Sequence, residues 1–101
     1  MAYSIKAKRQ ADKDVEEAMD WYEEQRPGLG AEFLFEFLAF CDKISRHPTH
    51  FTPKYPPYRR SLMKKFPYAI HFAVNEKAKE VVILAIWHIK RDPEMLKKRL
   101  K

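Results

Sequence analysis

The stretch YAIHFAVNEKAKEVVILAIWH, from Tyr68 to His88, decides the fold of this chain. It holds two apolar runs rich in β-branched and aromatic residues, Tyr68 to Asn75 and Glu80 to His88, which are typical of strands. The polar residues between them, Glu76 to Lys79, predict a tight turn and hence a hairpin. Every position from Val81 to Trp87 is apolar. That pattern is typical of a central strand covered on both faces, or covered on one face and used for binding on the other.

The first strand of this hairpin has two unlike faces, because side chains alternate along a strand. The large apolar side chains share one face: Tyr68, Ile70, Phe72 and Val74. We expect helices to cover this set. The opposite face carries Ala69, His71 and Ala73 and is predicted to be a shallow concavity, in which we interpret His71 as a structural residue.

Two amphipathic helices are predicted upstream of the hairpin. From about Arg9 to Gln25, apolar residues recur at helical spacing among acidic ones, and from Ala31 to about Arg46 a broader apolar stripe predicts a mostly buried helix. The link Arg26-Pro27-Gly28-Leu29-Gly30 separates them, because proline bars helix continuation and glycine can adopt the left-handed conformation that ends a helix. So short a link predicts an antiparallel helical hairpin.

The remaining segments complete an α+β fold. Alternation from Tyr3 to Ala7 predicts a first strand, and Tyr58 to Met63 is predicted to be another. Four prolines between His47 and Pro57 predict an ordered, extended loop, and the basic tail after Asp92 is expected to fray. The predicted order is β-α-α-β-β-β in a single domain over residues 1–101, with the helical hairpin packed on a small, mainly antiparallel sheet.

Charge is divided unevenly along the chain. Residues 58–101 carry a net charge of +8 and residues 1–57 a net charge of −2. The basic half favours acidic partners, whether phosphate backbones or an acidic protein. The predicted first helix, with Asp14, Glu17 and Glu24, would be repelled by phosphates, which argues against a helix-turn-helix that reads DNA.

Several classes of protein are disfavoured by composition. Cys41 is the only cysteine, so no internal disulfide and no thiolate metal cluster can form, and a reducing, cytoplasmic setting is the simpler expectation. No export signal and no run of 18 apolar residues is found, so we expect neither secretion nor membrane insertion. Pro48 separates His47 from His50 and precludes helical metal-ligand spacing. We expect no metal and no cofactor.

Four motifs in register resemble a known family of small proteins. They are WYEEQRPGLGAEFL (Trp21 to Leu34), Tyr58-Arg59-Arg60, Phe66-Pro67-Tyr68-Ala69-Ile70, and Trp87-His88-Ile89-Lys90-Arg91-Asp92-Pro93. With the predicted element order, they resemble the RelE/ParE superfamily of toxins from type II toxin-antitoxin modules, the plasmid stabilisation type, over essentially the whole chain. The resemblance implies a growth-inhibiting toxin held off by a cognate antitoxin protein. RelE-like members cleave mRNA on the ribosome, and ParE-like members inhibit DNA gyrase.

The chain departs from the RelE-like pattern at two positions. Ala69 stands where RelE-like nucleases place an arginine, and the position of the late tyrosine falls near Leu96. We therefore interpret the chain as ParE-like, with a ribosome-dependent mRNA endonuclease and a non-toxic antitoxin-binding relic as the alternatives. Whether it is an enzyme stays open. His88 is the catalytic candidate only if the chain is a nuclease, and the plainer alternative is that it ends a buried strand and bonds to backbone.

Basic residues are the candidates for contact with the target or the antitoxin. They are Arg59, Arg60, Lys64, Lys65, Lys90 and Arg91. Neighbours on a strand point to opposite faces, so at most one of Arg59 and Arg60 lines a given site, and we favour Arg60; the other is expected to be solvated or paired with the acidic first helix. Lys90 and Arg91 follow the last strand, where functional groups collect. We expect a negatively charged antitoxin segment with apolar anchors to cover the sheet and this basic half.

Overall fold

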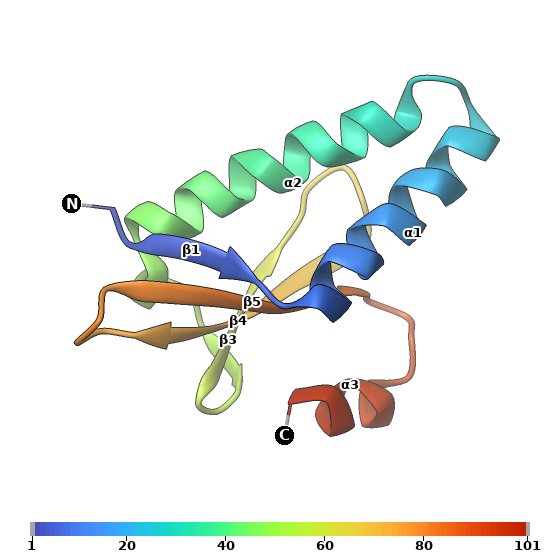
Figure 1. Ribbon diagram of the computed structural model, residues 1–101. Coiled ribbons are helices and arrows are strands. Elements are labelled where there is room, and N and C mark those ends of the chain that lie inside the picture. The colour runs from blue at the N-terminus through green and yellow to red at the C-terminus, as the bar shows by residue number, and fades with distance from the viewer. Residues whose placement is uncertain (1, 101) are drawn as a thin grey trace.

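The structure is a computed structural model that describes residues 2–100. Its elements, in chain order, are β1 (Ser4–Ala7), α1 (Arg9–Gln25), α2 (Leu29–Arg46), the 3₁₀ turn η1 (Pro48–His50), β2 (Pro53–Tyr55), β3 (Tyr58–Leu62), β4 (Tyr68–Asn75), β5 (Glu80–His88) and α3 (Pro93–Leu100). The predicted α+β class is confirmed, and each predicted helix and strand is present within about two residues of its predicted bounds. Figure 1 shows α1 and α2 together on one side of the sheet and α3 on the other.

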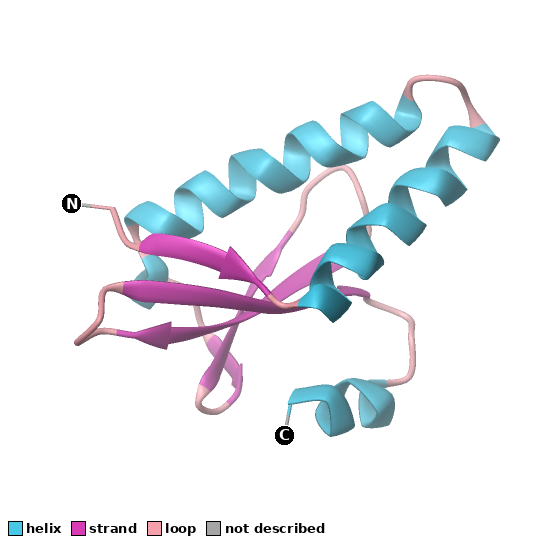
Figure 2. Ribbon diagram, in the orientation of Figure 1, coloured by secondary structure: helices cyan, strands magenta, loops and turns pink. Residues whose placement is uncertain are grey.

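The strands form one sheet in the order β1-β5-β4-β3-β2. β1 runs parallel to β5, and every other neighbouring pair is antiparallel, so the hairpin predicted from Tyr68 to His88 lies at the centre. Figure 2 shows this sheet as the layer between the helical hairpin and α3. None of the helices described in residues 2–100 is long and apolar enough to cross a membrane.

A register shift in the central hairpin explains the unbroken apolar run in β5. His71 pairs with Ala85, but Phe72 pairs with Ile83, so Leu84 is an extra residue in β5. Val81, Ile83 and Ile86 belong to the core under α1 and α2. Ala85 and Trp87 belong to a second cluster on the other face, against which Leu84 packs. The helical hairpin therefore covers one face of β5, and α3 covers part of the other.

The helices cover the large side chains of β4, as expected. Ile70 and Phe72 are fully buried in the main core, and Phe33 of α2 lies against the rings of Phe66 and Tyr68 at centroid distances of 5.1 and 5.2 Å. Such edge-to-face contacts contribute about 1 kcal/mol each beyond their burial. The helical hairpin is thus fixed on the sheet by aromatic packing.

Glycine is required twice in the link between α1 and α2. Gly28 has φ +93°, which other residues rarely adopt. At Gly30 a Cβ atom would approach the carbonyl oxygen of Met19 to 2.7 Å, so the two helices could not come so close. The carboxylate of Glu23 accepts hydrogen bonds from the N–H groups of both glycines. The predicted reversal is confirmed, and Glu23 closes it.

Two segments differ from their prediction. The tail after Asp92 does not fray, because Asp92 caps the N–H of Glu94 and the i, i+4 pair Leu96 and Leu100 is buried against the second cluster. The loop predicted over residues 47–57 contains η1 and the short strand β2, which pairs with β3 at the sheet edge. An edge strand tolerates proline because only one side of it is paired.

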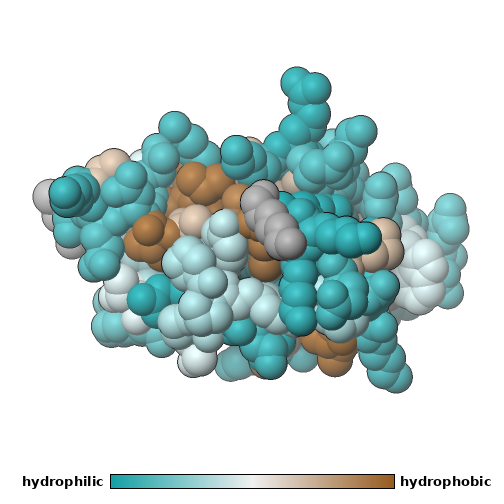
Figure 3. Space-filling view, turned by 90° about the horizontal axis from the view of Figure 1, so that it is seen from below, coloured by the Kyte–Doolittle hydropathy of each residue, from teal (hydrophilic) through white to brown (hydrophobic). Residues whose placement is uncertain are grey.

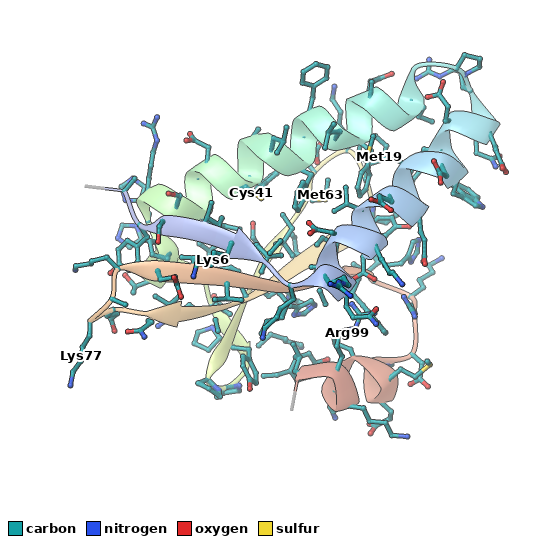
Figure 4. All side chains as sticks on the ribbon, viewed as in Figure 1. Lys6, Met19, Cys41, Met63, Lys77 and Arg99 are labelled. Carbon is teal, nitrogen blue, oxygen red and sulfur yellow. The ribbon has the colours of Figure 1, made fainter. Side chains whose placement is uncertain are left out.

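The carboxylate of Asp14 ties α1 to both β5 and α3. β1 ends at Ala7, opposite Ile83, so the N–H of Ile86 lies beyond its reach; it donates to Asp14 at 3.0 Å. The guanidinium of Arg99 donates to the same carboxylate, and Figure 4 shows Arg99 between α3 and the start of α1. The expectation that Asp14 belongs to an exposed acidic surface is wrong, since it is only 7% exposed.

Replacing Asp14 by asparagine should lower the free energy of unfolding by about 2 kcal/mol, because a half-buried cation and a buried backbone N–H lose their charged acceptor. Urea denaturation measures the loss. Asp12→Asn, an exposed acid in the first turn of the same helix, is the matched control and should change stability by less than about 0.5 kcal/mol. Equal effects of the two substitutions would contradict the role assigned to Asp14.

Candidate functional site

A small hollow opens on the sheet face away from the helical hairpin, beside the end of β5 and the start of α3. Its volume is about 80 Å³. It is lined by Tyr55, Arg60, Ala69, His71, Trp87, His88, Ile89, Arg91, Pro93 and Leu96. The concavity predicted on the small-residue face around His71 is confirmed, and α3, which the sequence did not predict, supplies one of its walls.

His71 is the most deeply buried polar residue of the hollow. It is 2% exposed and lies directly opposite Arg60 on β3. Burial, and to a lesser degree the charge of Arg60, lower the pKa of His71 from 6.5 to about 4. The imidazole is therefore neutral at neutral pH. Its Nδ1 atom has no hydrogen-bond partner within residues 2–100.

Trp87 carries two guanidinium groups on its ring. The guanidinium carbon of Arg91 lies 3.7 Å from a ring centroid of the indole, and that of Arg99 lies 5.0 Å away. Such cation–π contacts contribute about 0.5–2 kcal/mol each. The indole Nε1, like His71 Nδ1, lacks a hydrogen-bond partner in the described part of the chain. Arg91 is thus held at the hollow by the aromatic ring and not by an acidic residue.

His88 is positioned by backbone, as the plainer interpretation predicted. Its Nδ1 accepts a hydrogen bond of 3.0 Å from the N–H of Lys90, and its ring meets that of Tyr68 edge to face at 5.1 Å. Because Nδ1 is the acceptor, the neutral imidazole carries its proton on Nε2. In this tautomer, His88 can donate a hydrogen bond from Nε2 but cannot accept a proton there.

The predicted basic residues do not form one group. Arg60 and Arg91 line the hollow with His88, and Lys90 is exposed beside it. Arg59 donates to the carbonyl oxygen of Phe51 at 2.7 Å, so it fastens the loop before β2; the expectation that it is solvated or paired with the first helix is wrong.

Lys64 and Lys65 lie elsewhere, on the helical side of the molecule. Their backbone N–H groups donate to the carboxylate of Glu36 on α2, at 2.6 and 2.9 Å. Their exposed side chains border a separate groove of about 270 Å³ with Phe40 and Lys43. The carboxylate of Glu36 therefore draws this loop away from the hollow.

A larger groove lies on the same sheet face, bordered by the end of α3. It has a volume of about 370 Å³ and is lined by Lys8, Gln10, Tyr58, Ala73, Leu84, Arg99 and Leu100. Figure 3 looks at the molecule from below Figure 1 and shows hydrophobic side chains among hydrophilic ones on this side of the molecule. Apolar floor and basic rim suit an acidic segment with apolar anchors.

Residues that could supply other chemistry are few. Burial raises the pKa of the Cys41 thiol to about 12, so it stays protonated and is a poor nucleophile. Within residues 2–100, no group of three His, Cys, Asp or Glu side chains could hold a metal ion. The hollow offers cations, two aromatic rings and hydrogen-bond donors, which together can bind a negatively charged group.

Comparison with protein families settles the relationship of the chain. The family described as "ParE toxin of type II toxin-antitoxin system, parDE" matches residues 5–93. The chain belongs to the ParE toxin family. The resemblance to the RelE/ParE superfamily, carried by four sequence motifs, is therefore confirmed. No curated protein matches the chain significantly.

Solved structures share the fold at low sequence identity. A chain of the chromosomal ParDE system from P. aeruginosa has a TM-score of 0.76 and 19% identity, covering 88% of this chain and 98% of that one. A chain of the RelBE2 toxin-antitoxin complex from Mycobacterium tuberculosis has a TM-score of 0.61 and 17% identity, covering 87% and 92%. A chain of the archaeal RelE-RelB complex from Pyrococcus horikoshii has a TM-score of 0.57 and 21% identity, covering 91% and 100%.

Acid should destabilise this ParE-family chain through His71. Its folded pKa, about 4, lies below the unfolded value of 6.5, so between these values the unfolded state binds more protons and stability falls as pH falls. From pH 7 to pH 5 the loss should be about 2 kcal/mol. Urea titrations at both pH values measure it. His71→Gln should remove most of the difference; an equally large pH dependence in that variant would contradict the assignment.

Proposed function

We propose that this chain is a ParE-like growth inhibitor of the cytoplasm, which acts on DNA gyrase and is neutralised by a cognate antitoxin. Membership of the ParE toxin family supports the toxin-antitoxin assignment. Solved structures of the same fold come from ParDE and RelBE systems, two of them described as complexes, which supports an antitoxin as the partner. The choice of gyrase over mRNA depends on the chemistry of the hollow.

The preference for gyrase over mRNA as the target depends on Ala69 and Leu96. Both line the hollow, so the positions at which the RelE-like pattern places an arginine and a tyrosine are apolar walls here. Cleavage of RNA by its 2′-hydroxyl needs a proton acceptor and a proton donor beside the phosphate. His71 is buried with a pKa of about 4, and His88 has its Nδ1 engaged by Lys90. The site supports binding of an anionic group better than it supports proton transfer.

Growth and enzyme assays test the proposal. Induction of the chain alone should stop growth, and co-expression of the neighbouring gene should restore it. The purified chain should reduce supercoiling by gyrase, and transcript ends should show no codon-phased cuts. His88→Ala should remain toxic, because no proton transfer at this residue is required. Codon-phased cuts that vanish in His88→Ala would establish the endonuclease instead, and normal growth on induction would leave the non-toxic relic.

The groove beside α3 is the proposed antitoxin contact, and Leu84→Asp tests it. A carboxylate on the apolar floor opposes an acidic partner, so antitoxin affinity should fall at least tenfold, or about 1.4 kcal/mol. Phe35→Asp is the matched control, since Phe35 is 74% exposed on α2. Binding is measured by titration calorimetry, with thermal midpoints to confirm that both variants fold. A larger loss in Phe35→Asp would place the antitoxin on the helices.

A further inference from the structure

Two residues that line the hollow, Trp87 and His71, each carry a buried polar atom without a partner. Trp87 is 4% exposed and His71 is 2% exposed, and within residues 2–100 neither the indole Nε1 nor the imidazole Nδ1 has a hydrogen-bond partner. An unsatisfied buried polar group costs about 1–3 kcal/mol, and native proteins keep few of them. The third such atom, Oγ of Ser61, lies opposite Ile70 in the sheet register, whereas these two line one hollow. A ligand that accepts a hydrogen bond from the indole Nε1–H would recover the free energy lost at that atom.

The charge of the hollow defines the ligand as an anion. The indole Nε1–H is only a donor, so it requires an acceptor. Arg60 and Arg91 line the same space, and none of its lining residues is acidic. Arg91 has no carboxylate within salt-bridge distance in the described residues and is held by the Trp87 ring at 3.7 Å. Charged hydrogen bonds from guanidinium groups to an oxyanion are among the strongest that proteins form.

The size and walls of the hollow favour a carboxylate over a phosphodiester. A phosphodiester continues on both sides of the phosphate and needs an open groove, whereas a carboxylate ends its side chain and can enter a small space end-on. The hollow measures only about 80 Å³, and Ala69, Pro93 and Leu96 wall it with apolar groups. The groove of about 370 Å³ that also borders α3 could hold the adjoining backbone.

We propose that this hollow binds the carboxylate of a single Asp or Glu side chain supplied by the antitoxin. The carboxylate oxygens accept hydrogen bonds from Trp87 and the two arginines, and the imidazole of His71 closes the floor. The identity of the partner rests on the function proposed above. The chemistry of the ligand does not, because it follows from the residues of the hollow.

Nuclear magnetic resonance tests the ligand chemistry without the antitoxin. The chain has two tryptophans, so the indole N–H of Trp21, which is 55% exposed, is a built-in control for that of Trp87. Sodium acetate added to the purified chain should move the Trp87 signal downfield with saturation, and should leave that of Trp21 in place. Sodium chloride at equal ionic strength should shift neither signal. No selective shift of Trp87 with acetate would overturn the proposal.

Dimethyl phosphate and arginine variants sharpen the result. Dimethyl phosphate, a monoanion that is substituted on two sides like a phosphodiester, should bind more weakly than acetate; binding ten times tighter than that of acetate would assign the hollow to a phosphodiester and refute the carboxylate. Arg60→Gln and Arg91→Gln should each weaken acetate binding at least tenfold. Arg46→Gln removes the same charge from the exposed end of α2 and should leave binding unchanged. Equal weakening of acetate binding in all three variants would mean that binding depends only on the net charge of the chain, and would contradict a specific site.

A double-mutant cycle tests the partner. Each acidic residue of the antitoxin is changed to its amide, and affinity is measured against the original chain and Arg60→Gln. One position should lose about tenfold with the original chain and little with the variant, which is the signature of a direct contact. Acetate binding without such a coupled position would refute the antitoxin as the source. Growth arrest and neutralisation without acetate binding would refute the hollow while leaving the proposed function intact.

Discussion

The carboxylate of Asp14 joins three parts of the chain that are distant in sequence. It sits on α1, accepts the backbone N–H of Ile86 in β5, and binds the guanidinium of Arg99 in α3. Because β1 is too short to reach Ile86, this N–H would otherwise be buried without an acceptor. The same ion pair fixes α3 against the sheet, and α3 carries Leu96 into the wall of the hollow. The hollow therefore depends on Asp14 in α1, although Asp14 is not one of the residues that line it.

The net positive charge of residues 58–101 favours an acidic partner, but local hydrogen bonds determine which of the basic side chains can reach that partner. Arg59 is occupied by backbone carbonyl oxygens, and Glu36 turns the loop of Lys64 and Lys65 toward α2. Arg91 and Arg99 share the ring of Trp87, and their repulsion is relieved because Asp14 pairs with Arg99. Arg91 is left as a cation with an aromatic contact, free to meet an anion.

Strong local patterns made most of the fold predictable. The hairpin from Tyr68 to His88 and the two helices follow from periodicity and from the glycine link, and all are present. The helix α3 was missed because its lysines and arginines dominate the tail, although the cap at Asp92 and the spacing of Leu96 and Leu100 were visible. The extra residue at Leu84 could not be predicted, because all residues from Val81 to Trp87 are apolar and their pattern therefore favours no strand register over another.

The site was predictable where a residue's role follows from its strand, and unpredictable where it follows from tertiary contacts. Arg60, Arg91 and His88 were expected among one set of basic and titrating residues, and they line one hollow in a sheet where only β4 lies between β3 and β5. Trp87 and Tyr55 were not expected there. The sequence predicts Trp87 to be an ordinary core residue, and only the missing hydrogen-bond partner of its indole nitrogen distinguishes it from the other core residues of β5. Asp14 was interpreted as one more acidic residue of an acidic helix, because the sequence does not show that the N–H of Ile86 is left without a partner strand and needs this carboxylate.

In the proposed function, the cations of the hollow serve binding and not catalysis. Arginines stabilise an oxyanion whether or not a reaction follows, but cleavage also requires groups that accept and donate protons. In this chain the apolar Ala69 and Leu96 line the same hollow as Arg60 and Arg91, and burial keeps His71 neutral at neutral pH. Under the proposed function, occupancy of the hollow by an anion is itself the functional event. A tightly bound carboxylate from one partner would then exclude any other partner that needs the same arginines.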